Sequence, residues 1–349
     1  MTPLERTVAA LSFREGDRPP VFLLFTTHGA RVVGLPLPAY FRDERALVEA
    51  QLRLQATFGH DCLYAFQYAA LELEAWGGEA SFDEHAPPTA GAPVFRTPEA
   101  IARCEAPPSL EHPSLQRVLR VITGLRERSR GEVPIISVVI SPFSLPAMQL
   151  GLGPWLDLLH AALEEPGGPR AAQRDRLLAL NAAFTASWAR AQFDAGATAV
   201  VYFDPLSSST LTTEELGTEL GLRLAAQLVP ALPGPVALHF ASGRILPRLD
   251  AVLGAGARVV SASAEEDLAE LKRRCAGRAA LVGNLNGVRL TRWTVDEARA
   301  HARDALAVGA PGGGFILSDN HGEVPSGVAD EVLHGLVDEA WRWARRAHG

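Results

Sequence analysis

The feature that most constrains the fold is a pattern that recurs three times in the second half of the chain. In residues 194–204, 254–263 and 308–319, a helix-like segment ends at a glycine-containing step and an apolar run follows. Glycine at the carboxyl end of a helix adopts the left-handed conformation that lets the chain turn back. Apolar runs bounded by helices are typical of parallel strands that are buried on both faces of a sheet.

Eight apolar runs alternate with segments of helical spacing along the chain. We expect strands at residues 21–25, 62–66, 135–140, 198–204, 235–240, 258–263, 279–285 and 315–319. This alternation predicts a single α/β domain over residues 1–349, a (β/α)8 TIM barrel. The Gly- and Pro-rich stretch 68–112 is expected to be an insertion between strands two and three. A doubly wound sheet is the alternative, but neither a GxGxxG motif after the first strand nor a P-loop signature is present.

The composition excludes several classes of partner. The formal net charge is −7, and Lys272 is the one lysine in the chain. A net negative chain offers no broad basic surface for nucleic acid or an anionic membrane. No run of 18 apolar residues occurs, so we expect no membrane span. Because the first residues include Glu5 and lack the apolar core of a signal peptide, we expect a cytoplasmic protein.

Cysteine and lysine usage narrows the chemistry further. The three cysteines, Cys62, Cys104 and Cys275, are odd in number, and none has CxxC spacing. This pattern argues against a disulfide framework. Lys272 lies in LAELKRR, which has the character of an exposed helix face, so a Schiff-base mechanism through a barrel lysine is not expected.

In a barrel of parallel strands, the catalytic groups lie at the carboxyl ends of the strands, which converge on one mouth. His239 ends the strand within PVALHFASGRIL, residues 235–246, and Arg244 opens the segment that follows. The polar residues after the predicted strands are Thr26, Thr27, His28, Gln67, Tyr68, Ser141, Asp204, His239, Ser261, Ser263, Asn284, Asn286, Asp319, Asn320 and His321. This set predicts a pocket that contains carboxylate, amide and imidazole groups.

Each of these candidates also has a purely structural interpretation. His239 could be a core histidine bonded to a backbone carbonyl, and His321 could belong to a polar turn. Asp204 precedes a proline, a pair that favours turns and helix caps. Arg244 could bind an anionic group or pair with an acid on the surface.

Five stretches resemble the uroporphyrinogen decarboxylase superfamily, which also contains the zinc-dependent methyltransferases of corrinoid metabolism. They are RPPVFLLF (18–25), SPFSLPAMQLG (141–151), DAGATAVVYFDP (194–205), GNLNGVRL (283–290) and FILSDNHGEVPSG (315–327). The resemblance covers nearly the whole chain. It implies a (β/α)8 barrel with its site at the carboxyl ends of the strands, and family members often form dimers.

The resemblance to the decarboxylase branch is incomplete. Tyr68 stands at the position of that branch's pyrrole-binding aspartate, and Met148 at the position of its tyrosine. The positions of its substrate-binding arginines fall near residues 24–30, and Arg31 is the closest arginine. His321 and Arg244 remain as candidates for binding a substrate carboxylate.

The resemblance to the methyltransferase branch implies a different site. His239 matches a zinc-binding histidine, while Ala241 and His321 stand where that branch has cysteine ligands. Glu72 and Glu74 in ELEAWG match its acidic segment; they would share a face on a strand and diverge on a helix. Two histidines and a glutamate would form a ligand set suited to zinc or a similar metal.

These comparisons favour metal-dependent methyl transfer between a corrinoid, free or on a corrinoid protein, and a small acceptor such as a thiol. The catalytic candidates are His239, His321 and Asp204, and the metal candidates are His239, His321, Glu72 and Glu74. The substrate-binding candidates are His28, Tyr68, Ser141, Met148, Arg244, Asn284 and Asn320. Two alternatives are a decarboxylase-like lyase acting on a tetrapyrrole or another carboxylated substrate, and a non-catalytic tetrapyrrole- or corrinoid-binding protein.

Overall fold

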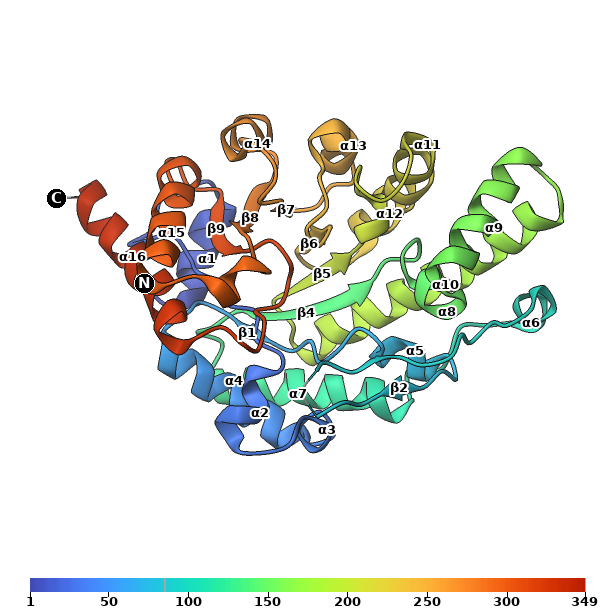
Figure 1. The fold of residues 1–349 in the computed structure, drawn as a ribbon, viewed down its shortest axis with the longest axis horizontal. Coiled ribbons are helices and arrows are strands. Elements are labelled where there is room, and N and C mark those ends of the chain that lie inside the picture. The colour runs from blue at the N-terminus through green and yellow to red at the C-terminus, as the bar shows by residue number, and fades with distance from the viewer. Residues whose placement is uncertain (85, 349) are drawn as a thin grey trace.

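The computed structural model of the chain describes residues 1–84 and 86–348. Its main sheet has parallel strands in the order β1-β4-β5-β6-β7-β8-β9. These are β1 (Leu63–Tyr64), β4 (Ile135–Ile140), β5 (Ala199–Phe203), β6 (Val236–His239), β7 (Val259–Ala262), β8 (Ala280–Leu285) and β9 (Phe315–Asp319). The curled sheet surrounded by helices is a TIM-barrel-like α/β fold, as the alternation predicted (Figure 1).

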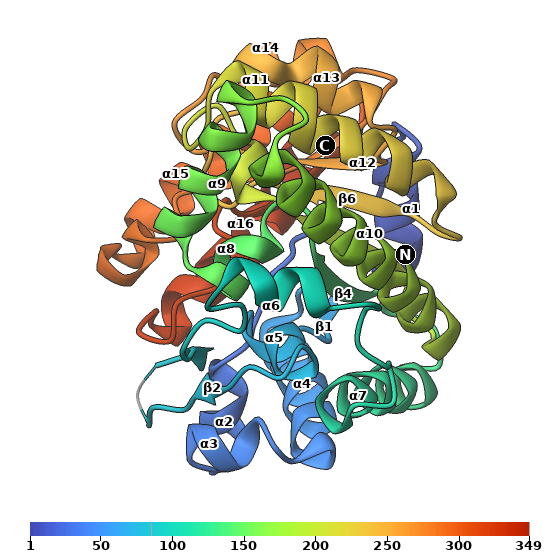
Figure 2. The ribbon, with the colours of Figure 1, turned by 90° about the vertical axis from the view of Figure 1, so that its right-hand side faces the viewer.

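Helices surround the sheet, some in contact with its strands and others packed on neighbouring helices. They are α1 (Pro3–Leu11), α2 (His28–Val33), α3 (Leu37–Tyr40), α4 (Glu44–Phe58), α5 (Leu71–Ala75), α6 (Pro98–Arg103), α7 (Pro113–Ser129), α8 (Leu145–Leu150), α9 (Leu152–Glu164), α10 (Pro169–Ala195), α11 (Glu214–Leu216), α12 (Arg223–Leu228), α13 (Leu249–Gly254), α14 (Leu268–Cys275), α15 (Val295–Gly309) and α16 (Asp330–His348). Short helical turns are η1 (Pro205–Ser207), η2 (Gly217–Leu222), η3 (Val229–Ala231), η4 (Leu246–Arg248) and η5 (Arg289–Arg292). Figure 2 shows the long helix α10 running between α7 and α12.

Local sequence signals explain where the helices begin and end. The Asp43 side chain accepts hydrogen bonds from the amides of Arg45 and Ala46, which starts α4, and Gly59 ends this helix with a φ of 67°. Gly196, in the recurring pattern, ends α10 with a φ of 114°. These left-handed positions favour glycine because a Cβ atom is strained there.

Alternation along the strands divides the apolar core into two sets. One set points inward and fills the barrel, and it includes Tyr64, Val138, Val201, Ala237 and Val282. The neighbouring strand residues point outward and pack against the helices in the other set. A strand buried on both faces needs apolar residues at every position, which accounts for the continuous apolar runs in the sequence.

The expected first strand, residues 21–25, contacts both ends of the sheet but forms only one β-bridge, between Val21 and Leu317. The Phe22 amide donates to the Leu317 carbonyl at 2.9 Å, and the Asp61 amide donates to the Val21 carbonyl at 2.8 Å. Phe22 and Leu24 belong to the inward-pointing core. The segment therefore fills the space between β9 and β1.

The stretch between β1 and α7 contains α5, a small antiparallel pair and α6. The pair consists of β2 (Ala80–Ser81) and β3 (Thr89–Ala90), and it is separate from the main sheet. Pro87 and Pro88, next to β3, line a cavity at the carboxyl ends of the strands. This stretch therefore contributes one wall of the barrel mouth.

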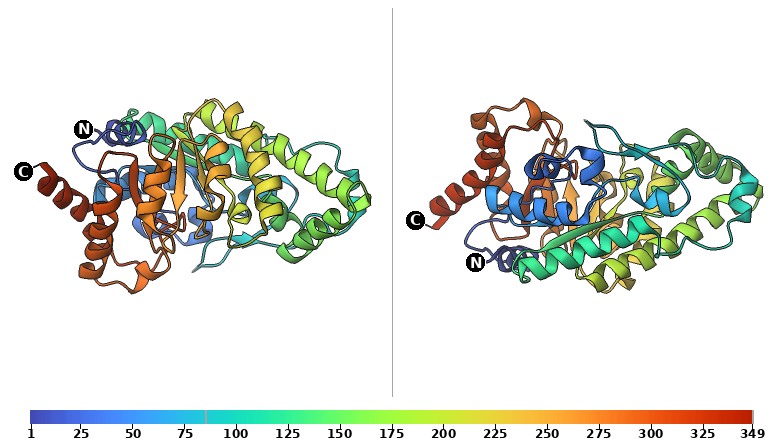
Figure 3. Two further views of the ribbon diagram at one scale, coloured as in Figure 1. Left: turned by 90° about the horizontal axis from the view of Figure 1, so that it is seen from above. Right: turned by 90° about the horizontal axis from the view of Figure 1, so that it is seen from below.

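Both termini lie at the same end of the molecule (Figure 3). The arrowhead of β4 points away from them, toward α8, so the termini mark the end opposite the mouth (Figure 1). Within residues 1–84 and 86–348, the helices lack the combination of length and apolar character that crossing a membrane requires.

A buried ion-pair cluster fixes the end of the barrel near the termini. Asp61 is fully buried and accepts hydrogen bonds from Arg6 Nη1 at 2.6 Å and Arg18 Nη1 at 2.5 Å. Its Oδ2 also accepts the Val21 amide at 2.7 Å. The Arg18 guanidinium lies 4.7 Å from the ring centroid of Trp341 on α16. The cluster thus links the first helix, the first strand and the last helix.

Candidate active site

A cavity of about 200 Å³ lies at the carboxyl ends of the strands. Its walls are mainly apolar and aromatic, with one imidazole and one carboxyl group. The lining residues are Tyr64, Phe66, Tyr68, Ala69, Pro87, Pro88, Val138, Ile140, Phe203, His321, Gly322 and Glu323. Among these described lining residues there is no lysine or arginine. A concave, largely apolar pocket with a few polar groups is the usual form of a small-molecule site.

The loop after β9 supplies the polar groups of this cavity and is held in place by hydrogen bonds. The Oδ1 atom of Asp319 accepts the amides of His321 at 2.8 Å and Gly322 at 2.9 Å. The Tyr64 hydroxyl donates to the Gly322 carbonyl at 3.2 Å. These contacts fix His321 and Glu323 relative to the barrel, as a preorganised site requires.

Glu323 is the carboxyl group of the cavity. The Thr26 hydroxyl, at the end of residues 21–25, donates a hydrogen bond to its Oε1. The pKa of Glu323 is raised to about 7, mainly by burial and also by the nearby Asp319, while the Thr26 hydroxyl opposes the shift. A carboxyl with a pKa near 7 can both accept and donate a proton at neutral pH.

His239 ends β6 and points inward, next to this loop. Its ring stacks on Phe203 at a centroid distance of 5.8 Å. The Ala241 amide donates to Nδ1 at 3.1 Å, so the neutral ring carries its proton on Nε2. The pKa of His239 is lowered to about 4, mainly by burial and also by the nearby His321. A Cβ added at Gly322 would lie 3.0 Å from the His239 ring, so glycine permits this close approach.

Glu72 and Glu74 do not join the two histidines. Glu72 is fully buried on α5 and accepts the Ile140 amide at 3.1 Å. Burial raises the pKa of Glu72 to about 8, opposed by the Ile140 amide and by Trp188. Glu74 accepts the Tyr68 hydroxyl at 2.8 Å. On the helix these two glutamates diverge, as the spacing predicted for a helical segment.

The predicted metal set is therefore only partly assembled. His239 and His321 lie close to each other, but Glu72 and Glu74 are engaged elsewhere. Across the described part of the chain, no three His, Cys, Asp or Glu side chains converge in a way that could hold a metal ion. As placed, these residues do not fit a zinc centre, and we assign no step to a metal.

Asp204 is placed by the alternation of β5 outside the barrel interior. Its side chain is fully buried and accepts the hydroxyls of Ser141 at 2.7 Å, Ser144 at 2.7 Å and Ser207 at 2.6 Å. Burial raises the pKa of Asp204, and the three serines oppose this. The carboxylate and Ser141 thus tie the end of β4 to the end of β5, and neither lines the cavity.

Three other predicted substrate-binding residues lie away from the cavity lining. His28 begins α2, and burial lowers its pKa to about 4. Met148, on α8, packs against the apolar core. Arg244 is exposed, and its Nη2 lies 3.0 Å from Oε2 of Glu265.

The predicted asparagines and Tyr68 surround the mouth. Asn320 is buried and accepts the Gly287 amide at 3.2 Å. The Asn284 side-chain amide lies 3.5 Å from the Ser263 carbonyl. Tyr68 lines the cavity and accepts a hydrogen bond from Arg117 Nη2 at 2.9 Å. Of the predicted substrate-binding set, Tyr68 is the member that lines the cavity itself.

Glu323, Tyr64, Phe66 and Phe203 were not among the predicted site residues. The three aromatic residues follow the inward alternation of their strands, which was a usable signal in the sequence. Glu323 comes two residues after His321 in SDNHGEVPSG, a stretch already assigned to the closing loop. Its contact with Thr26 spans 297 positions along the chain, and no local pattern indicates it.

Comparison with known proteins places this geometry in a family. The sequence profile described as Uroporphyrinogen decarboxylase (URO-D) matches residues 2–343. The uroporphyrinogen decarboxylase of Mycolicibacterium smegmatis is 26% identical, over 94% of this chain and 97% of that protein. The uroporphyrinogen decarboxylase of Bordetella parapertussis is 30% identical, over 67% of this chain and 66% of that protein.

Solved structures show the same fold. A methyltransferase from Methanosarcina mazei superposes with a TM-score of 0.85 at 20% identity, covering 97% of this chain and 98% of that one. A putative vitamin B12-independent methionine synthase from Listeria monocytogenes has a TM-score of 0.58 at 15% identity, covering 96% and 98%. The profile match extends over nearly the full length, and the chain belongs to the uroporphyrinogen decarboxylase family.

Proposed function

We propose that this family member transfers a methyl group to a small, neutral acceptor bound at the mouth of the barrel, with Glu323 as the general base. The observation that carries the proposal is the placement of a carboxyl with a pKa near 7 in an apolar cavity without lysine or arginine in its described lining. Such a group is poised for proton transfer at neutral pH.

The size and charge of the cavity favour a small, neutral substrate. A volume of about 200 Å³ is below the range of roughly 300–1,000 Å³ that is typical of sites for drug-sized ligands. A polycarboxylated tetrapyrrole would also place negative groups beside Glu323 and Asp319, with no lysine or arginine in the described lining to offset them. These points disfavour uroporphyrinogen as the substrate.

In the proposed reaction, Glu323 takes the proton of the acceptor, for example a thiol S–H. The electron pair of the acceptor forms the new bond to the methyl carbon, while the pair of the broken bond stays with the donor. His239, which lies beside the cavity behind Gly322, carries its proton on Nε2, and Phe66 and Phe203 form part of the apolar wall. A corrinoid, free or on a partner protein, would supply the methyl group; the cavity is too small to enclose it, so we assign it no binding residue.

The test is an assay of methylcobalamin demethylation by thiols, followed by absorbance, with wild type, Glu323→Gln and the control Glu265→Gln. Glu265 is exposed beside Arg244 and outside the cavity. We expect Glu323→Gln to lower the rate by about 10²–10⁴-fold. The wild-type rate should rise with pH through about 7, because the base must be ionised. A thiol-dependent rate that is equal in all three proteins contradicts the assignment of Glu323.

A second candidate is a carboxy-lyase acting on a small carboxylated substrate, because the curated relatives are uroporphyrinogen decarboxylases. Protonated Glu323 would then deliver its proton to the carbon that keeps the electron pair when CO2 leaves. This role requires the acid form, so the rate of CO2 release should fall as pH rises through about 7. The opposite pH dependence separates the two reactions. Ligand binding without turnover in either assay would support the non-catalytic alternative.

We also propose that residues 21–25 complete the sheet as the eighth strand of a closed barrel, with residues 68–112 as an insertion after the second strand. The hydrogen bonds that these residues make to Leu317 and Asp61 support closure. Slow amide hydrogen exchange at Phe22, comparable to that of β9, is the expected result.

A further inference from the structure

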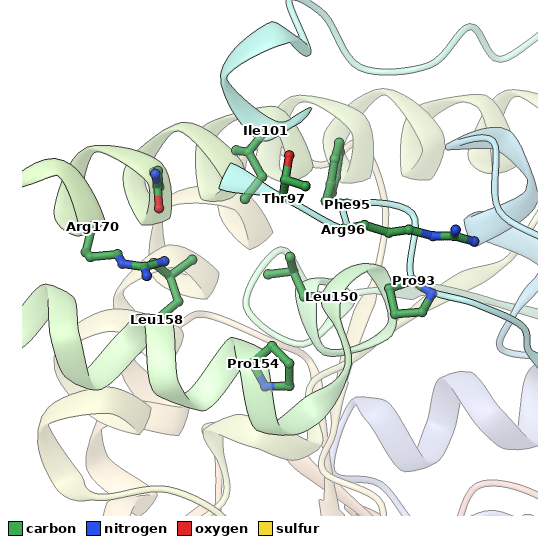
Figure 4. A pocket seen from close by; sticks show the side chains of 10 residues that line it. Pro93, Phe95, Arg96, Thr97, Ile101, Leu150, Pro154, Leu158 and Arg170 are labelled. Atoms are coloured by element: carbon green, nitrogen blue, oxygen red, sulfur yellow. The ribbon is translucent and has the colours of Figure 1, made fainter. Parts of the chain in front are cut away.

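A second cavity, of about 330 Å³, lies apart from the barrel mouth (Figure 4). It is bounded by the segment that leads into α6, by α8 and α9, and by the start of α10. The lining residues are Pro93, Phe95, Arg96, Thr97, Ile101, Leu150, Pro154, Leu158, Arg170 and Gln173. None of them lines the mouth cavity. Its volume is within the usual range of small-molecule sites.

The polar groups of this second cavity are cationic or neutral. Neither Arg96 nor Arg170 forms a hydrogen bond or an ion pair through its guanidinium with any residue of 1–84 and 86–348, and the described lining has no acid. The side-chain oxygen of Gln173 is buried without a hydrogen-bond partner among those residues. Figure 4 shows Arg170 extending toward Leu158, at the end of the cavity opposite Pro93.

The apolar part of the cavity lies between its two arginines. Phe95, Ile101 and Leu158 are almost fully buried, and Leu150 is packed against the core. Arg170 is also in the first turn of the 27-residue helix α10, where the helix dipole favours a negative charge. The cavity therefore has an apolar surface along its length and a cationic group, Arg170, at one end.

We propose that this cavity binds an amphiphilic anion, with a carboxylate or phosphate head on Arg170 and an apolar chain along Leu150, Leu158 and Phe95. A planar guanidinium binds such heads through paired hydrogen bonds. The charged groups of the two cavities differ: the described lining of the mouth has one carboxyl group and no lysine or arginine, and the described lining of this cavity has two arginines and no acid. The proposal goes beyond the reaction at the mouth and does not depend on it.

The test is isothermal titration of the full-length protein with octanoate, octyl phosphate and the uncharged analogue 1-octanol. We expect both anions to bind and octanol to bind at least about ten-fold more weakly, since a hydrogen bond to a charged group is lost. The tighter of the two anions identifies the head group. Equal binding of octanol, or no binding of either anion in the millimolar range, would overturn the proposal.

Two variants locate the binding in the cavity. Arg170→Gln should weaken octanoate binding at least about ten-fold. Arg174→Gln is the matched control on the same helix; its guanidinium contacts Asp175 and does not line the cavity. Unchanged thermal unfolding of both variants will show that they fold. Equal octanoate affinity of Arg170→Gln and wild type would place any binding elsewhere and reject this site.

Discussion

The two ends of the barrel treat buried carboxyl groups in opposite ways. At the end near the termini, Asp61 has both oxygens engaged by the guanidinium groups of Arg6 and Arg18. At the mouth, the buried Asp319 and the half-buried Glu323 form no ion pair with a lysine or arginine among the described residues, and burial raises the pKa of both. The carboxylate near the termini is therefore paired with guanidinium groups, whereas the carboxyl groups at the mouth are not.

This difference indicates that one end of the barrel serves stability and the other serves chemistry. A paired, hydrogen-bonded carboxylate keeps its charge and fixes the elements around it, which serves stability. Burial without a neighbouring guanidinium raises the pKa of a carboxyl, which costs stability; for Glu323 the pKa of about 7 permits proton transfer at neutral pH. In barrels of this kind, the carboxyl ends of the strands carry the chemistry and the opposite end contributes stability. The predictions below test this contrast.

Asp61→Asn should have the largest effect on stability. The change leaves Arg6 and Arg18 buried without their shared counter-ion, and breaking such a pair costs about 3–5 kcal/mol. Urea unfolding measures the loss. The control is Asp17→Asn, because Asp17 also contacts Arg6 but is partly exposed, and its loss should cost about 1 kcal/mol or less. Equal losses would mean that burial of the pair is not decisive.

Glu72→Gln should stabilise the protein at alkaline pH. The folded-state pKa of about 8 lies above the usual 4.5, so the stability that the protonated group contributes is complete below pH 4.5 and is lost as pH rises to 8. The variant should match wild type at pH 5 and exceed it by on the order of 3 kcal/mol at pH 9. Thermal unfolding across this range checks it, and a constant difference contradicts it.

Glu323→Gln should also stabilise the protein as pH rises, but the gain should be smaller than for Glu72→Gln and should stop increasing at a lower pH. The folded-state pKa of about 7 means that wild-type stability falls between pH 4.5 and 7 and is level above that. The variant should gain on the order of 2 kcal/mol over wild type by pH 8, and no more at pH 9. A gain in stability together with a loss of activity would show that the ionised Glu323 lowers stability and is needed for the reaction. If Glu323→Gln were less stable than wild type, Glu323 would contribute to stability as Asp61 does, and the proposed difference between the two ends would be wrong.

The contrast between the two ends was only partly predictable from the sequence. Strand positions followed from apolar runs, and period-two alternation decides which strand ends face the interior. Val201 and Phe203 point inward, so Asp204 must point outward, where three serines bind it. His239 follows Ala237 into the interior by the same rule. The same rule predicts from the sequence that Asp204 faces away from the barrel interior.

Contacts between distant segments could not be predicted in this way. The pKa of Glu323 depends on how the last loop packs against residues 21–26, and the contact with Thr26 closes nearly the whole chain. The two buried arginines around Asp61 likewise come from separate segments. A single sequence gives the order of the elements, whereas these contacts depend on how the closed sheet brings its first and last segments together.

Arg244→Gln should have the smallest effect on stability. It also tests whether Arg244 contributes a positive charge to the site at the mouth. Arg244 is 54% exposed and pairs with Glu265, which is 60% exposed, so its removal should change stability by no more than about 0.5 kcal/mol. If the site excludes cations, the KM and kcat of the reaction assigned by the assays above should also be unchanged. A several-fold rise in KM at constant kcat would instead show that Arg244 holds an anionic substrate. Arg244 would then supply the positive charge that the described cavity lining lacks. The carboxy-lyase would become the stronger candidate.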